Sequence, residues 1–203
     1  GVVDEEHAMI GSDHFGLNGP KIDHAIIAEP SELAICPVHK GQICFGLRTT
    51  GVSVHSSLPE KGKNAIFHMA RVVVALEAYA AELGTRPPHP MAGRPTLSVG
   101  VIRGGNSVSS VPDWCELDID RRTIPGENHA DVLAEITAVI EAVAAETPDM
   151  EYSLIDAALD VPPLGIGIET PTVQALQAAT ASVLGTASEI RSFTGSTDAP
   201  NFR

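Results

Sequence analysis

The alternation of apolar and polar side chains along residues 40–156 is the feature that most constrains the fold of this chain. It has a period of two around Ile43, Leu97 and Leu117 and over residues 151–155, which is the pattern of β-strands with one buried face. Two intervening segments carry apolar residues three or four positions apart, as amphipathic helices do. The order of strand, helix, strand, strand, helix and strand predicts the split βαβ arrangement of a ferredoxin-like α+β domain.

The first of the two predicted helices has a clear start, because Asn64 is a favourable N-cap residue. A proline-rich loop is expected after this helix, over residues 85–95. The apolar residues expected on the core face of the first helix are Ile66, Met69, Val73 and Leu76.

Short apolar runs before this domain predict strands of a second, parallel sheet. Val2 and Val3 lead into Asp4-Glu5-Glu6, and residues 25–28 lead into Glu29. Buried strands of a parallel sheet have such continuous apolar runs, and ligands collect at their carboxyl ends. We therefore expect both acidic segments to lie at the strand ends of an α/β sheet.

The last segment of the chain is expected to continue this α/β domain. Residues 160–167 form a Pro/Gly-rich linker, Thr170-Pro171 favours the start of a helix, and a strand is expected near residues 189–192. The predicted organisation is one part of an α/β domain over 1–39, an inserted domain over 40–156 and a second part of the α/β domain over 157–203.

Composition excludes several classes of function. The 26 acidic and 13 basic side chains give a formal net charge of −13, which opposes binding to nucleic acid. The sequence has no apolar run of the length that spans a bilayer, so no membrane association is expected. Cys36, Cys44 and Cys115 have no metal-like spacing, which favours reduced thiols and a cytoplasmic location.

Three adjacent carboxylates, Asp4-Glu5-Glu6, are the first candidates for chemistry. Adjacent carboxylates repel one another, so the run is costly unless a cation lies near it. A metal-assisted hydrolase uses such an arrangement, with one carboxylate binding metal and its neighbour accepting a proton from water. Glu29 could join the same cluster. Taken alone, each acidic segment is better explained as a solvated turn or loop.

His55 lies in a segment, residues 51–57, whose glycine and serine residues predict an exposed loop. A neutral imidazole there can bind a metal ion or donate a hydrogen bond to a developing oxyanion. The other seven histidines are expected at surface or loop positions with structural roles: His7, His14, His24, His39, His68, His89 and His129.

Two further segments could contact a substrate. A strand that ends in Arg121-Arg122 can present a guanidinium to a carboxylate. In a regular strand, Arg122 shares the polar face with Asp120 and Glu116, and the alternative role is a surface ion pair of little energetic weight. Glycine and small hydroxyl residues over 195–198 allow a ligand to approach the backbone closely, or they form a simple turn.

The order of these motifs resembles one enzyme family. The chain contains, in sequence, Asp-Glu-Glu, Glu-Pro-Ser, His-Lys-Gly, Gly-x-x-x-His-Ser-Ser-x-Pro-x-x-Gly-x-Asn-Ala, Gly-Gly, Val-Pro-Asp, Asp-Arg-Arg, Pro-Gly and Gly-Ser-Thr-Asp-Ala. This order is similar to that of the zinc-dependent peptidases and deacylases, which include acetylornithine deacetylase, succinyl-diaminopimelate desuccinylase, glutamate carboxypeptidase and aminoacylase. The resemblance covers nearly the whole chain, and the His55 and Arg122 segments are its most specific parts.

The resemblance implies a partial catalytic domain with an inserted lid domain that usually dimerises. It implies hydrolysis of an amide bond in an N-acyl amino acid or small peptide, with two zinc ions that cobalt or manganese can replace. In the pattern of this family, Glu5 is the general base, Glu6 and Glu29 each bind one zinc ion, and Asp4 orients the strand end.

The resemblance also implies how the lid and the last loop serve the site. His55 reaches into the site of the partner subunit of a homodimer and stabilises the oxyanion, while Arg122 helps to bind the substrate carboxylate. Ser109 stands where the family usually has asparagine, three residues before a proline, and is the candidate for that substrate contact. The residues that line the substrate pocket are Gly195, Ser196 and Thr197.

A complete site of this family needs more ligands than this sequence contains. The first histidine ligand and the bridging aspartate of the family precede the Asp-Glu-Glu run, and the last histidine ligand follows the Ser-Thr-Asp loop. We therefore expect this chain to be an internal piece with a split half-site. Two alternatives stay open: an isolated lid or dimerisation module without activity, and a pseudoenzyme that binds a small acid without turnover.

Overall fold

The computed structural model describes residues 9–202, so Asp4, Glu5 and Glu6 lie outside the described residues. The elements in chain order are α1 (Ile10–Asn18), β1 (Ile35–His39), β2 (Gly41–Thr50), the 3-10 turn η1 (Pro59–Lys61), α2 (Ala65–Leu83), β3 (Thr96–Gly104), β4 (Trp114–Thr123), α3 (His129–Glu146), β5 (Glu151–Val161), β6 (Leu164–Gly165), α4 (Pro171–Leu184), β7 (Ile190–Phe193) and the 3-10 turn η2 (Ala199–Asn201).

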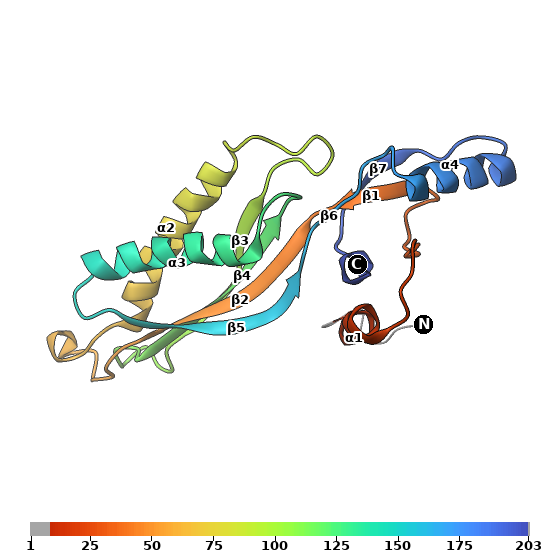
Figure 1. Ribbon diagram of the computed structural model, residues 1–203. Helices are drawn as coiled ribbons and strands as arrows, with labels where there is room; N and C mark the ends of the chain where they lie inside the picture. The colour runs from red at the N-terminus through yellow and green to blue at the C-terminus, as the bar shows by residue number, and fades with distance from the viewer. Residues whose placement is uncertain (1–8, 203) are drawn as a thin grey trace.

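The described residues form two β-sheets, one in each lobe of the molecule. One sheet has the strand order β6-β1-β7 and the other has the order β3-β4-β2-β5. Figure 1 shows the two lobes joined where β1 leads into β2 and β5 leads into β6. No helix within residues 9–202 is long and apolar enough to cross a membrane.

The four-stranded sheet confirms the predicted ferredoxin-like arrangement. All three strand pairs in it are antiparallel, and α2 and α3 connect strands that are not neighbours in the sheet. The two helices lie together on one face of the sheet (Figure 1). No helix of residues 9–202 covers the other face, which carries the polar side chains of β4.

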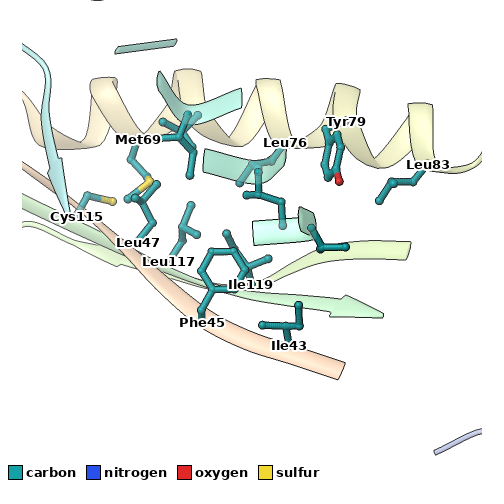
Figure 2. Packing of buried hydrophobic residues seen from close by; sticks show 14 of the residues in the cluster. Ile43, Phe45, Leu47, Met69, Leu76, Tyr79, Leu83, Cys115, Leu117 and Ile119 are labelled. Carbon is teal, nitrogen blue, oxygen red and sulfur yellow. The ribbon is translucent and has the colours of Figure 1, made fainter. Parts of the chain in front are cut away.

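The core of this lobe lies between the sheet and the two helices, as Figure 2 shows. Burial alternates strictly along β4, where Cys115, Leu117 and Ile119 are no more than 2% exposed. A period of two places every second side chain on the helix-covered face, so the strand pattern read from the sequence is confirmed. The helices contribute the other half of the core, mainly through Met69, Val72, Leu76, Ile136 and Ile140.

Asparagine side chains start both helices of the lobe. Asn64 accepts a hydrogen bond from the backbone N–H of Phe67, which confirms the predicted cap, and Asn128 caps α3 in the same way. The core face of α2 differs slightly from the prediction. Ile66 is 37% exposed and does not belong to the core face. That face instead extends toward the C-terminal end of α2 through Tyr79 and Leu83.

The flanking segments differ from the predictions in three ways. Residues 25–28 are not a strand, because no described strand pairs with them, and Ile26 is 66% exposed. Helix α1 was not anticipated, since its apolar residues have no helical stripe. The expected linker over 160–167 contains the end of β5 and the whole of β6.

The chain passes between the two lobes twice, at adjacent points. His39 pairs with Leu164 on the β1 side, and Gln42 pairs with Val161 on the β2 side. Gly41 lies between these pairs, where an added Cβ would come within 2.3 Å of Thr123 Oγ1 and 2.6 Å of the Pro163 nitrogen. Only glycine therefore fits at this crossing without movement of the neighbouring backbone.

The core assignment predicts the effect of removing one buried side chain. Leu117 is fully buried in the centre of the lobe, and we expect Leu117→Ala to lower the free energy of unfolding by about 2–5 kcal/mol because a cavity remains. Leu17→Ala is the matched control, since Leu17 is 76% exposed on α1. Urea unfolding followed by circular dichroism measures both changes, and equal losses for the two variants would contradict the assignment.

Candidate functional site

The loop over residues 195–198 meets the crossing between the lobes, and two of its side chains are held there. Ser196 Oγ lies 3.3 Å from Oε1 of Gln42, and Thr197 Oγ1 lies 3.1 Å from Nε2 of His39. His39 ends β1 and Gln42 lies one residue into β2. The loop is therefore fixed by the two residues that flank Lys40-Gly41.

His39 is buried, so its expected place on the surface is wrong. It is 1% exposed, and its Nδ1–H donates to the carbonyl oxygen of Lys40 at 2.8 Å. Burial lowers the pKa of His39, although the hydrogen bond to Lys40 opposes this shift. In the neutral ring Nε2 is an acceptor, so the Thr197 hydroxyl donates to it. His68 is also buried, at 8% exposed.

Both hydrogen-bonding functions of the Thr197 hydroxyl are used inside the protein. It donates to His39 and accepts from the backbone N–H of Ala199 at 3.1 Å. The side chain is 4% exposed. A ligand at this loop would therefore meet its backbone and Ser196 before the Thr197 hydroxyl.

The guanidinium of Arg122 is bound side-on by Asp120, as expected for two residues on one face of a strand. Its Nε and Nη2 atoms each donate to a carboxylate oxygen of Asp120 at 2.9 Å. Asp120 also accepts from Nε2 of Gln42 at 3.0 Å. Arg122 and Ser196, both expected near the substrate, are thus joined through Asp120 and Gln42.

Glu29 and Thr197 line one cavity of about 310 Å³ beside the small sheet. Cys36 and His39 line the same cavity, and its walls are otherwise mostly apolar. Glu29 thus shares a cavity with Thr197, while Ser196 and Arg122 are linked through Gln42 and Asp120. Burial raises the pKa of the Cys36 thiol, which disfavours a reactive thiolate there.

The donor set of the described residues does not fit a zinc site. Within residues 9–202, no group of three or more His, Cys, Asp or Glu side chains could hold a metal ion. Glu29 is the only expected ligand in that range, and Glu6 lies outside it. A structural zinc site needs four ligands and a catalytic one needs at least three from protein, so further ligands would have to join Glu29.

His55 and Ser109 lie together at the opposite end of the lobe that contains the four-stranded sheet, which we call the lid. His55 forms a β-bridge with Ser110, and the N–H of Ser56 donates to the carbonyl oxygen of Ser109 at 2.9 Å. The ten residues of β2 separate this end from Gln42 and Arg122. At about 3.3 Å per residue, the two groups of residues are on the order of 25–30 Å apart.

Hydrogen bonds to Ser57 prepare the His55 ring as a donor. The backbone N–H of Ser57 donates to Nδ1 at 3.2 Å, and the Ser57 hydroxyl lies 2.7 Å from the same atom. Because Nδ1 accepts, the neutral ring carries its proton on Nε2. The exposed imidazole can therefore donate to an oxyanion, which is the chemistry expected of it.

Sequence reasoning missed Gln42 and Ser57, and it assigned no role to Arg121, which it placed only on the face opposite Arg122. Arg121 is fully buried and pairs with Glu127 at 2.6 Å. The period of β4 accounts for this burial, because Arg121 continues the face of Leu117 and Ile119. Gln42 carried no such signal, since Asp120 and Ser196 lie far from it in the sequence.

The burial of His39 predicts a dependence of stability on pH. The unfolded chain binds a proton at this residue more readily than the folded one, so stability is complete above the unfolded pKa of about 6.5. It is then lost as the pH falls through the lower folded pKa, with a slope of up to about 1.4 kcal/mol per pH unit. Urea unfolding at several pH values between 7.5 and 5 should show a shallower slope for His39→Gln.

His14→Gln is the control for this experiment, because His14 is exposed on α1. It should leave the slope unchanged. A slope that is the same in the His39 variant and the wild type would show that His39 protonates equally in both states.

Comparisons with known proteins agree with the architecture and the motifs. The family model described as a peptidase dimerisation domain matches residues 38–148. The acetylornithine deacetylase of Vibrio parahaemolyticus is 37% identical over 148 residues, which are 71% of this chain and 39% of that protein. That of Proteus mirabilis is 38% identical over 146 residues, which are 69% of this chain and 38% of that protein. The chain thus spans less than half of the length of these relatives.

Solved structures show the same fold. A tripeptidase from Staphylococcus aureus has a TM-score of 0.73 and 20% identity, over 98% of this chain and 51% of that one. An aminobenzoyl-glutamate utilization protein from Klebsiella pneumoniae has a TM-score of 0.61 and 22% identity, over 90% of this chain and 45% of that one. With the match to more than half of its residues, the chain belongs to the peptidase dimerisation domain family, within the zinc-dependent peptidases and deacylases.

Proposed function

We propose that the protein is a metal-dependent hydrolase that cleaves the amide bond of an N-acyl amino acid or small peptide. The observation that carries this proposal is the 37% identity to an acetylornithine deacetylase over 148 residues, a stretch longer than the matched dimerisation domain. The similarity therefore includes residues outside the matched dimerisation domain. An N-acyl amino acid is the substrate class that the name of this relative indicates.

The region around Arg122 has the charge that a substrate carboxylate needs. Within residues 9–202, Nη1 of Arg122 makes no hydrogen bond, so it can donate to a second carboxylate beside Asp120. Lys40 is close, and its pKa is lowered by burial and then by the charges of Arg122 and Arg121. The unused N–H of Arg122 at this end of the sheet can bind an anionic group, with Ser196 near it as a hydrogen-bonding partner.

The proposed roles of the acidic residues follow the family pattern. Glu5 accepts a proton from the attacking water, Asp4 orients the strand end, and Glu6 and Glu29 each contribute a ligand to one of two zinc ions. Bound zinc would polarise the amide carbonyl and favour ionisation of water, and cobalt or manganese could replace it. Ligands beyond the described residues are needed to complete this centre, and the described chain by itself is not proposed to hold it.

The separation of His55 from Arg122 supports a composite site in a homodimer. The ten residues of β2 keep the two ends of the lid on the order of 25–30 Å apart, so one copy cannot bring both to one small substrate. The outer edge of β3 is unpaired among the described strands, and Val101 and Ile102 are 46% and 54% exposed on it. We propose that the lid pairs with a second copy, whose His55 and Ser109 then reach the substrate.

Replacement of the general base tests the reaction. In the complete, zinc-loaded protein, Glu5→Ala should reduce kcat for an N-acetyl amino acid by about 10²–10⁴-fold, because no carboxylate accepts the proton of water. Zinc content, measured on the same sample, should not change. Glu60→Ala, in the exposed η1 turn, is the control.

Two results would contradict this proposal. If Glu5→Ala keeps its activity, the assignment of the base is wrong. If the wild-type protein binds zinc or a small acid but hydrolyses no N-acetyl amino acid or dipeptide, the protein is a pseudoenzyme or a binding module.

Mixing two inactive variants tests the composite site. A His55→Ala dimer and a Glu5→Ala dimer should each be nearly inactive. After exchange of subunits, half of the dimers contain one copy of each, and one of their two sites is intact. Activity should therefore return to about one quarter of the wild-type value. If His55 acts within its own subunit, no activity returns on mixing.

A further inference from the structure

The Gln42 side chain contacts both the 195–198 loop and the carboxylate that holds Arg122. Its Nε2 donates to Asp120 Oδ2 at 3.0 Å and lies 3.2 Å from Sγ of Cys44. A carboxylate accepts hydrogen bonds and donates none, so the amide nitrogen must face Asp120. The amide oxygen then faces Ser196, and the Ser196 hydroxyl is the donor of the 3.3 Å contact.

These hydrogen bonds form one directed chain across the junction between the lobes. Ser196 donates to Gln42, Gln42 donates to Asp120, and Asp120 accepts two more hydrogen bonds from Arg122. Such chains polarise their members and strengthen one another. Arg122 and Gln42 are also directly opposed in the β2–β4 pairing, so their side chains leave the same face of the sheet side by side.

The position of Asp120 depends on Gln42 as well as on Arg122. Asp120 is 36% exposed and Arg122 is 30% exposed, so packing alone does not hold either side chain in one rotamer. The hydrogen bond from Gln42 fixes the carboxylate, and the side-on pair then fixes the plane of the guanidinium. Without the hydrogen bond from Gln42, the Asp120 carboxylate could rotate, and the Arg122 guanidinium paired with it would rotate too.

We propose that Gln42 is a positioning residue, which ties the 195–198 loop to the Arg122 guanidinium and so sets the spacing at which the site holds a substrate carboxylate. This inference rests on the proposed function, because the substrate carboxylate belongs to it. Gln42 itself touches no reacting atom. Its effect is on substrate affinity, through Arg122 on one side and Ser196 on the other.

The kinetic test uses Gln42→Met in the complete protein, because methionine keeps the length of glutamine without its hydrogen bonds. With the best substrate in a panel of N-acetyl-L-amino acids, KM should rise about tenfold while kcat changes less than about twofold. Gln42→Glu should raise KM further, since a carboxylate at position 42 would repel the Asp120 carboxylate and displace it from Arg122. Gln177→Met is the matched control on α4 and should change neither parameter.

A second measurement does not depend on activity. In ¹⁵N-labelled protein, the side-chain Nε–H of Arg122 should exchange with solvent several-fold faster in Gln42→Met than in the wild type. Ser196→Ala should give a smaller increase, because it acts through Gln42, and Gln177→Met should give none. A purely local structural role of Gln42 would change stability but would leave Arg122 exchange and KM as they are.

The outcomes separate this inference from the proposed function. Faster Arg122 exchange together with a raised KM supports it. Unchanged exchange, or faster exchange with an unchanged KM, overturns it even if the protein is an active amidohydrolase. If the complete protein hydrolyses no N-acetyl amino acid, the proposed function fails, and the exchange rates still decide whether Gln42 holds Arg122.

Discussion

The antiparallel pairing of β2 with β4 is the interaction on which the rest of the structure depends. Its register is unbroken from Gly41 opposite Thr123 to Thr50 opposite Trp114. One face of this pair supplies the apolar side chains that α2 and α3 cover, and the other face supplies Gln42, Asp120 and Arg122. A slip of one residue would exchange the two faces, so the core and the cluster of Gln42, Asp120 and Arg122 are set by the same register.

The lid could be read from the sequence because its elements obey local rules. The alternation along β4 and the asparagine caps of α2 and α3 are properties of short segments, and the structure confirms them. Residues 25–28 have the composition of a strand, yet a strand also needs a partner for its backbone, and no described strand provides one. Composition alone therefore gave the wrong element there.

The site was partly predictable for the same reason. Asp120 and Arg122 are two residues apart on one strand, and their contact follows from the period of the strand. His39 and Gln42 bind Thr197 and Ser196, which are more than 150 residues away, and only the folded chain brings them together. The burial of His39 was missed because a histidine beside a lysine resembles an exposed turn until β6 and β7 flank β1.

The two adjacent crossings between the lobes have a consequence for how such proteins can be assembled. The lid leaves the small sheet after His39 and returns to it at Leu164, and these two residues are paired. A domain whose ends lie side by side can be inserted into a host, or exchanged between hosts, with little disturbance of the surrounding sheet. The lid is thus a domain that is joined to the small sheet by two adjacent, paired chain segments. Any exchange of the domain would have to retain the glycine at position 41 in the first of these segments.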